Sequence, residues 1–263
     1  LYGEFKEFFP FLKRGELDIK TIYKQNASGE RKLDVFGSAK HLSTSVATCE
    51  VINVDLAVKN WDDFKLERAD IKLKSLVSNY GNLKSFSLKA KGEDDFIDFA
   101  SQVESMDSYL MNLKINSKLF ISDLKKKRDD QGVNLKFVHN VSGTLGKAKI
   151  MTQEPITVIF GKVFSIIVPD IEANDGRLNL DLTLNDSQIK GKVVTKNFPA
   201  AVISKFLPPS FNQSLISGAA ELNGSMSSPV FNTAFELSNA RLLDKESIAA
   251  VLKLSSHIQN NSL

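Results

Sequence analysis

The sequence has few of the residues that build catalytic and metal sites. Its 263 residues include one cysteine, Cys49, and three histidines, His41, His139 and His257, none within metal-ligand spacing of another. A single cysteine excludes an internal disulfide framework, and its apolar surroundings favour a small core residue over a reactive thiol. No HExxH, CxxC, GxSxG or GxxxxGK[ST] motif occurs, so metalloprotease, redox, hydrolase and NTPase functions lack their signatures.

Charge and hydrophobic runs exclude further classes. The 34 basic and 31 acidic residues give a net charge of +3 and are spread along the chain, whereas nucleic-acid binding needs a clustered basic stripe. No stretch approaches the roughly 18 apolar residues of a membrane span. The chain begins Leu1-Tyr2 rather than with methionine. We therefore expect a fragment of a longer protein, with any anchor segment outside it.

Alternation of apolar and polar residues with period two dominates the chain and predicts strands with one apolar and one wet face. The clearest apolar rows are Ile52, Val54, Leu56 and Val58; Met111, Leu113 and Ile115; and Leu178, Leu180, Leu182 and Leu184. Further strands are predicted at 16–24, 32–40, 68–74, 83–91, 133–139, 145–151, 156–168, 188–196, 215–223 and 230–238. The pattern predicts a mainly β fold, built as a mostly antiparallel sheet.

A few short helices are predicted between the strands. Phe5, Phe8 and Phe9 precede Pro10 in one helix at 4–9, and Pro199 begins another at 199–207. Asp94-Asp95 is predicted to cap a third, with Phe96, Phe99, Ala100 and Val103 along one face. These three helices are too few to cover the apolar faces of the strands. The sheet must therefore close on itself as a sandwich or barrel, the commoner solution, or bend into a trough whose apolar lining awaits a ligand.

The order of motifs in the second half resembles a known module. Phe198-Pro199-Ala200-Ala201-Val202-Ile203 leads through Pro208-Pro209 to Ser217-Gly218-Ala219-Ala220-Glu221-Leu222 and then Pro229-Val230-Phe231-Asn232. Upstream stand Gly81-Asn82-Leu83, Ser142-Gly143-Thr144-Leu145, Glu154-Pro155-Ile156 and Gly176-Arg177-Leu178 in matching order. This pattern resembles the repeating unit of the TamB family of translocation and assembly module proteins, within the AsmA-like group. The similarity covers most of the chain, with a departure at the polar insertion 121–132.

The resemblance implies an elongated, curved β-groove with approximate units 1–92, 93–197 and 198–263, lined by the three apolar rows given above. It implies a protein of the Gram-negative periplasm, held in the inner membrane by an anchor outside this fragment. Phospholipid acyl chains and an outer-membrane β-barrel of the TamA type are the implied partners. We expect no enzymatic activity, no cofactor and no metal, because the family pattern carries no catalytic residues.

Two other functions stay open. A periplasmic assembly factor or chaperone would use the sheet edges to pair with strands of nascent outer-membrane barrels. A polysaccharide-binding β protein is the weaker alternative, because it would show clustered aromatic residues and paired carboxylates on one strand face. The chain has a single tryptophan, Trp61, and its acidic pairs fall at predicted turns or helix starts.

Overall fold

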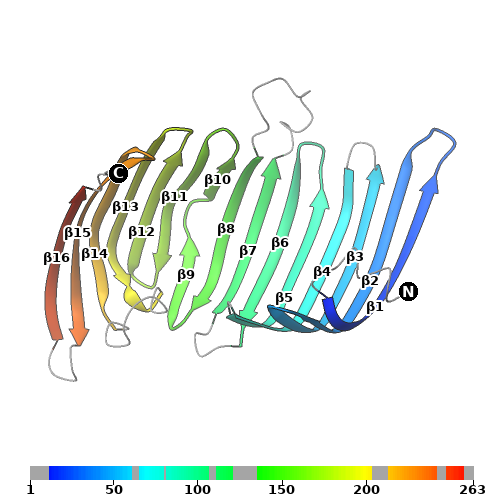
Figure 1. The fold of residues 1–263 in the computed structure, drawn as a ribbon, viewed down its shortest axis with the longest axis horizontal. Helices are drawn as coiled ribbons and strands as arrows, with labels where there is room; N and C mark the ends of the chain where they lie inside the picture. Colours follow the sequence, from blue (N-terminus) through cyan, green and yellow to red (C-terminus); the bar gives the residue numbers. More distant parts are fainter. Residues whose placement is uncertain are drawn as a thin grey trace, which may run out of the picture. The chain divides into compact units, whose positions relative to one another are not determined.

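The chain divides into two compact units, Leu1–Asn116 and Ser117–Leu263, each made of antiparallel β-strands. The computed structural model describes residues 12–60, 65–79, 81–106, 111–120, 135–202, 213–241 and 247–257. Within these ranges, no helix is long and apolar enough to cross a membrane. The mainly β, antiparallel fold expected from the sequence is confirmed (Figure 1). The three repeat units implied by the resemblance stay a prediction.

In the first unit, consecutive strands lie side by side in chain order. They are β1 (Leu12–Gln25), β2 (Arg31–Thr44), β3 (Ala47–Asn60), β4 (Lys65–Ser78), β5 (Gly81–Gly92), β6 (Phe96–Ser105) and β7 (Met111–Phe120), whose residues from Ser117 onward belong to the second unit. Each strand from β1 to β5 pairs antiparallel with the next. This simple order is what short hairpin turns between alternating segments produce.

The second unit continues with nine strands. They are β8 (Leu135–Leu145), β9 (Ala148–Thr152), β10 (Ile156–Phe160), β11 (Phe164–Ala173), β12 (Gly176–Leu184), β13 (Gln188–Pro199), β14 (Leu215–Ser225), β15 (Ser228–Arg241) and β16 (Ser247–His257). The two short strands β9 and β10 share one position, because β9 pairs with β8 and β11 at one end and β10 pairs with the same two at the other. The strand predicted at 156–168 is therefore two strands, separated at Gly161-Lys162-Val163.

The predicted helix after Asp94-Asp95 is wrong. These aspartates form the hairpin turn in which Glu93 N donates to Phe96 O at 2.8 Å, and the following residues are strand β6. Ile97, Phe99 and Val103 also fit the strand period of two. Pairing with β5 places them on one face of the sheet and therefore favours a strand over a helix. The predicted helix at 4–9 lies outside the described residues. Of the helix at 199–207, only a 3₁₀ turn at 200–202 is described.

Strands of the first unit bend where a residue adopts a left-handed backbone conformation. His41 in β2 has φ 50° and Ser75 in β4 has φ 54°, and each lies between two paired positions of its ladder with β3. At this point Lys40 and His41 are both exposed, so two consecutive side chains face the same side. Ala39 and Cys49, which flank the bend on the other side, are buried. Figure 1 shows the lower ends of these strands turning away from their upper parts.

In the second unit, strand β13 also bends at a residue with positive φ. Asn197 has φ 49°, and Lys196 and Asn197 are both exposed between the buried Thr195 and Phe198. The pairing with β14 shifts here, from Thr195↔Gly218 to Phe198↔Ile216. Gly218 has φ 148°, and a Cβ at this position would lie 2.2 Å from Ala234 O. Only glycine fits where the neighbouring strand approaches this closely.

The bend makes a testable prediction about backbone strain. His41→Val should lower the free energy of unfolding by about 1–2 kcal/mol relative to His41→Gly, because a β-branched residue is strained at positive φ. Lys40→Val is the matched control, since Lys40 is the exposed neighbour in extended conformation. Urea unfolding measures all three. Equal stability of the two His41 variants would show that the left-handed conformation at this bend is not required.

Candidate functional site

The candidate functional site is the apolar face of the sheet in each unit. In the first unit, Ile52 pairs with Ala39 and Leu73, and Leu73 pairs with Phe86, so apolar side chains continue from strand to strand. The apolar face of this unit comprises Leu33, Val35, Ala39, Ile52, Val54, Leu56, Val58, Leu66, Ala69, Ile71, Leu73, Phe86, Leu88, Ala90, Ile97, Phe99 and Val103, with Met111, Leu113 and Ile115 of β7 in the same half-buried alternation.

The second unit has an equivalent apolar face. Leu180 on β12 lies between Val168 on β11 and Val193 on β13, and Leu178, Leu182 and Leu184 occupy matching positions. The four leucines are half-buried, whereas Asn179 and Asp181 between them are exposed. The face extends over Phe137, Val158, Phe160, Phe164, Ile166, Val168, Ile189, Val193, Ala220, Leu222 and Phe235.

No second layer packs on these faces within the described ranges. Extensive contacts join only strands that are neighbours in the sheet. The buried apolar residues are mainly alanines, together with a small cluster of Ile150, Ala173 and Phe198 near the strand ends of the second unit. Of the predicted lining residues, Val58 is buried and the other ten are half-buried. The described residues thus shield the leucine, isoleucine and phenylalanine side chains on their flanks and do not cover them from above, as an open trough requires.

Charged side chains gather on the opposite face. Lys32 Nζ lies 2.8 Å from Glu67 Oε2, and Lys84 Nζ lies 2.9 Å from Glu104 Oε1. The hydrogen bond between Lys32 and Glu67 raises the pKa of the lysine and lowers the pKa of the glutamate. In the second unit Lys192 Nζ lies 3.1 Å from Glu221 Oε1 on the paired strand. These exposed pairs contribute little to stability individually, but they keep the charged residues away from the apolar face.

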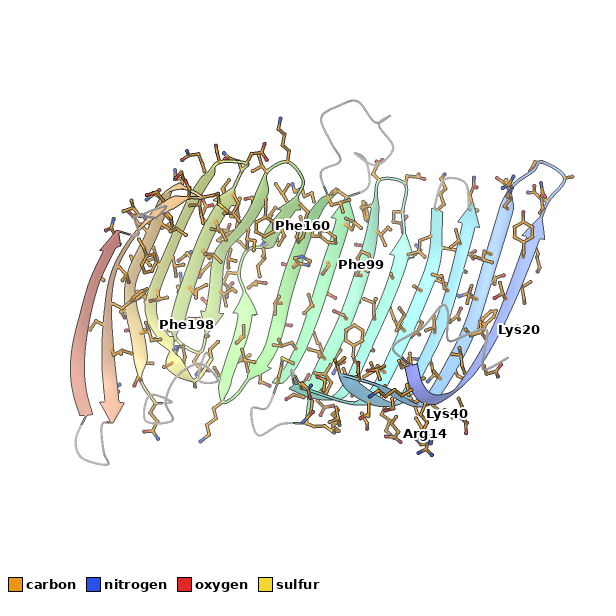
Figure 2. All side chains as sticks on the ribbon, viewed as in Figure 1. Arg14, Lys20, Lys40, Phe99, Phe160 and Phe198 are labelled. Carbon is orange, nitrogen blue, oxygen red and sulfur yellow. The ribbon has the colours of Figure 1, made fainter. Side chains whose placement is uncertain are left out.

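An aromatic group occupies one part of the apolar face in the second unit. The Phe137 and Phe160 rings meet edge to face with centroids 5.8 Å apart, and Phe164 lies 5.2 Å from Phe160. Phe160 remains 46% exposed, and Figure 2 marks its position on the strand. Such contacts add to the burial of apolar area. They also leave ring surface open to a further apolar group.

A polar couple lies beside this aromatic group. Ser117 Oγ and His139 Nδ1 are 2.6 Å apart, and the imidazole stacks on Phe137 with an interplanar angle of 13°. Both residues are half-buried. Burial lowers the pKa of His139, so the ring is neutral at pH 7. In a nucleophilic triad the serine contacts Nε2 and a carboxylate orients Nδ1. Here Nδ1 contacts the serine, so the couple does not have triad geometry.

The contact between Ser117 and His139 could be predicted only in part from the sequence. Ser117 continues the row Met111, Leu113 and Ile115, so its side could be inferred from the alternation. The residue opposite Ser117 on the next strand could not be inferred, because the polar insertion 121–132 leaves the start of that strand undefined in the sequence. Residues 121–134 and Trp61 lie outside the described residues. The pairing Ile156↔His139 shows where β8 enters the sheet.

Cys49 is buried with 6% exposure, and its Sγ lies 3.5 Å from the carbonyl oxygens of Val51 and Lys74. Burial raises the pKa of the thiol, which suits the core role expected for it rather than a nucleophile. Among the residues that the structure describes, no three His, Cys, Asp or Glu side chains come together to hold a metal ion.

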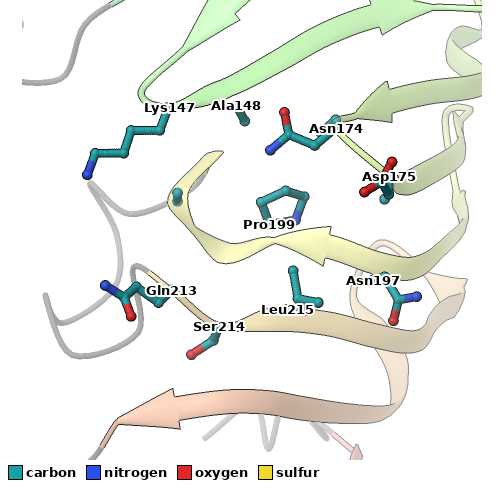
Figure 3. A pocket seen from close by; sticks show the side chains of 12 residues that line it. Lys147, Ala148, Asn174, Asp175, Asn197, Pro199, Gln213, Ser214 and Leu215 are labelled. Carbon is teal, nitrogen blue, oxygen red and sulfur yellow. The ribbon is translucent and has the colours of Figure 1, made fainter.

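A pocket of about 450 Å³ lies at the strand ends of the second unit. Figure 3 shows Asn174 and Asp175 on one side of Pro199 and Ser214 with Leu215 on the other. Two of its polar side chains bond to neighbouring strands and turns: Asn174 Oδ1 accepts from Lys149 N at 2.9 Å, and Asn197 Oδ1 accepts from Ser217 Oγ at 3.3 Å. The Ser214 hydroxyl is buried without a partner among the described residues. The pocket therefore shows no convergent set of polar groups committed to a ligand.

Comparisons with protein-family models, with curated proteins and with solved structures find no match to this chain. The resemblance to the TamB family stays a prediction from the order of its motifs.

The lowered pKa of His139 predicts a specific pH dependence. The unfolded residue titrates near pH 6.5, and the folded residue titrates below that. As the pH falls through about 6.5, the unfolded chain binds a proton that the folded chain does not, so stability decreases until the folded pKa is reached. His139→Phe removes this contribution and leaves the other two histidines of the chain in place.

Urea unfolding of wild type and His139→Phe between about pH 7.5 and 5 measures the effect as a difference. The stability of wild type relative to the variant should fall across this range. A difference that does not change with pH would contradict the assignment of His139 as a neutral, half-buried residue.

Proposed function

We propose that this chain is a non-enzymatic lipid-binding protein of envelope biogenesis, of the TamB type, whose apolar faces hold phospholipid acyl chains. The observation that carries the proposal is the apolar face, which no described element covers and which bears no Asp, Glu, Lys or Arg in the strand interiors described above. A charged surface would favour a polar ligand, and a sealed core would leave no room for any. An uncharged, open, apolar trough suits hydrocarbon chains.

The dimensions fit this ligand. Strands are spaced about 4.8 Å apart, and an acyl chain accounts for about half of a 30 Å hydrocarbon core, or about 15 Å. One chain lying across the strands would thus contact three or four of them. Each methylene removed from water gains up to about 0.8 kcal/mol. Shielding of this kind lowers the barrier to lipid transfer through water without any bond chemistry.

The wider role follows the same proposal. The protein would bridge the inner and outer membranes in the periplasm of a Gram-negative cell, held by an anchor outside this piece of chain. Its partner at the outer membrane would be a β-barrel of the TamA type. The support for this part is the resemblance in motif order, together with the antiparallel strand order of each unit.

One observation favours a second function, strand addition to nascent outer-membrane barrels. Strand β1 pairs only with β2 among the described strands, so none of those strands occupies its other edge. Its apolar side chains are more exposed than those of inner strands, with Leu17 at 43%, Ile19 at 50% and Tyr23 at 56%. An edge of this length, without proline, can accept another strand. Co-purified unfolded barrel protein would favour this function, and co-purified phospholipid the lipid conduit.

Substitution of Leu180 tests the lipid-binding proposal. Leu180→Asp places a charge on the apolar face, where a bound acyl chain would strip it of water. We expect phospholipid binding to fall at least about tenfold, since each 1.4 kcal/mol corresponds to a factor of ten. Folding should survive with a loss of about 1–3 kcal/mol, because the unliganded face leaves the carboxylate hydrated.

Asn179→Asp is the matched control, because it adds the same charge to the opposite face of the same strand. It should bind lipid as wild type does. Lipid extraction and native mass spectrometry measure bound phospholipid, and circular dichroism follows folding. Complete unfolding of Leu180→Asp would indicate that a layer covers this face, and normal lipid binding by a folded Leu180→Asp would reject the proposed function.

A further inference from the structure

The polar couple of Ser117 and His139 is out of place on a face that otherwise excludes charge. Across strands β8 to β14 of the second unit, His139 is the one imidazole on the apolar face. Its Nδ1 is occupied by Ser117, and the structure gives Nε2 no protein partner within the described residues. A polar group in such surroundings costs free energy once water is displaced, unless it finds a hydrogen-bond partner.

The hydrogen bond between the two residues leaves one donor unused, whichever way the proton lies. If Ser117 Oγ–H donates to Nδ1, then the proton of the neutral ring is on Nε2, which can donate. If Nδ1–H donates to Oγ, the serine hydroxyl keeps its own proton to donate. In both tautomers the couple therefore presents a neutral N–H or O–H donor to whatever covers the face.

We propose that the Ser117–His139 couple is a polar binding point for the carbonyl oxygen of an acyl ligand whose hydrocarbon chain lies on the apolar face. The inference rests on the proposed function, since it places one part of the same ligand. An acyl carbonyl oxygen can accept a hydrogen bond from the unused donor. A saturated hydrocarbon displaces water from the donor and offers it no acceptor. The open Phe137 and Phe160 rings lie next to the couple and provide apolar surface for the adjoining methylenes.

The charges around the couple favour a carbonyl rather than a phosphate at this point. A phosphate anion prefers lysine, arginine or several N–H donors. The described strands that carry and flank the couple place Lys136 on the opposite face, where its Nζ lies 5.5 Å from the Phe120 ring centroid. A neutral imidazole with one donor suits a neutral carbonyl or carboxylic acid. A phosphate headgroup would then lie away from this point, in water.

The test compares three ligands of equal chain length: palmitic acid, methyl palmitate and hexadecane, each delivered from cyclodextrin to the purified chain. His139→Phe keeps an aromatic ring but removes the donor, and Ser117→Ala removes the partner that orients it. We expect His139→Phe to weaken binding of the acid and the ester about 3–10-fold, the effect of one hydrogen bond. Binding of hexadecane should not weaken. Ser117→Ala should show the same selectivity with a smaller loss.

Ser101→Ala is the matched control. Ser101 also lies on an apolar face, but its Oγ donates to Ile115 O at 3.4 Å, so it has no donor to offer. This variant should bind all three ligands as wild type does. If His139→Phe weakens the acid alone, the carbonyl recognised is that of a free fatty acid. If it weakens acid and ester alike, the ester carbonyl of a glycerolipid also fits. Both results support the inference.

The failures of the two proposals are distinguishable. If wild type binds all three ligands and His139→Phe binds them equally well, the carbonyl site is wrong while acyl-chain binding stands. If wild type binds none of the three, the proposed function itself fails and the inference with it. Circular dichroism of each variant accompanies the titrations, and the hexadecane affinity reports whether the apolar face of a variant remains intact.

Discussion

The described part of the structure depends on alternation in strands whose extensive contacts are all with lateral neighbours. Each residue in a strand faces the side opposite to the residue before it, so one face collects the leucine, isoleucine, valine and phenylalanine side chains. In most proteins a second layer then covers that face. Here contacts such as Ile52 with Leu73, and Leu180 with Val168 and Val193, run sideways between paired strands. Each such pair contributes about 0.2–1 kcal/mol.

Bending the strands buries additional apolar surface in a sheet that is stabilised by lateral contacts. Where His41 and Asn197 adopt positive φ, two consecutive side chains turn to the polar face, and apolar residues on either side of the bend stay together. The buried residues Cys49 and Phe198 lie at these bends. The curvature thus shields some apolar surface without a second layer. It also leaves the middle of each strand open, which is where a ligand would lie.

The separation of charge between the two faces has the same origin. Lysine and glutamate side chains on the polar face pair across strands in water, as Lys192 and Glu221 do. On the apolar face of the second unit, Ser117 and His139 form a neutral polar couple in which one of the two imidazole nitrogens is paired internally. The unused donor of this couple discriminates between ligands, because an unpaired donor penalises a purely hydrocarbon ligand.

The sequence by itself determined the strands and their two faces, because a period of two needs no knowledge of the neighbours. The rows at 52–58, 111–115 and 178–184 were predictable for this reason, and all lie on apolar faces. The helix predicted from Phe96 and Phe99 was wrong because short apolar spacings fit both periods, and only pairing with β5 decided between them.

Three features were decided by the tertiary structure alone. Whether the sheet closes or stays open depends on contacts between distant strands, which composition does not reveal. The bends depend on single residues in a left-handed conformation, and histidine, serine and asparagine at those positions carry no unique signal. The meeting of Ser117 with His139 depends on strand register across a polar insertion, and register is a property of the assembled sheet rather than of either strand.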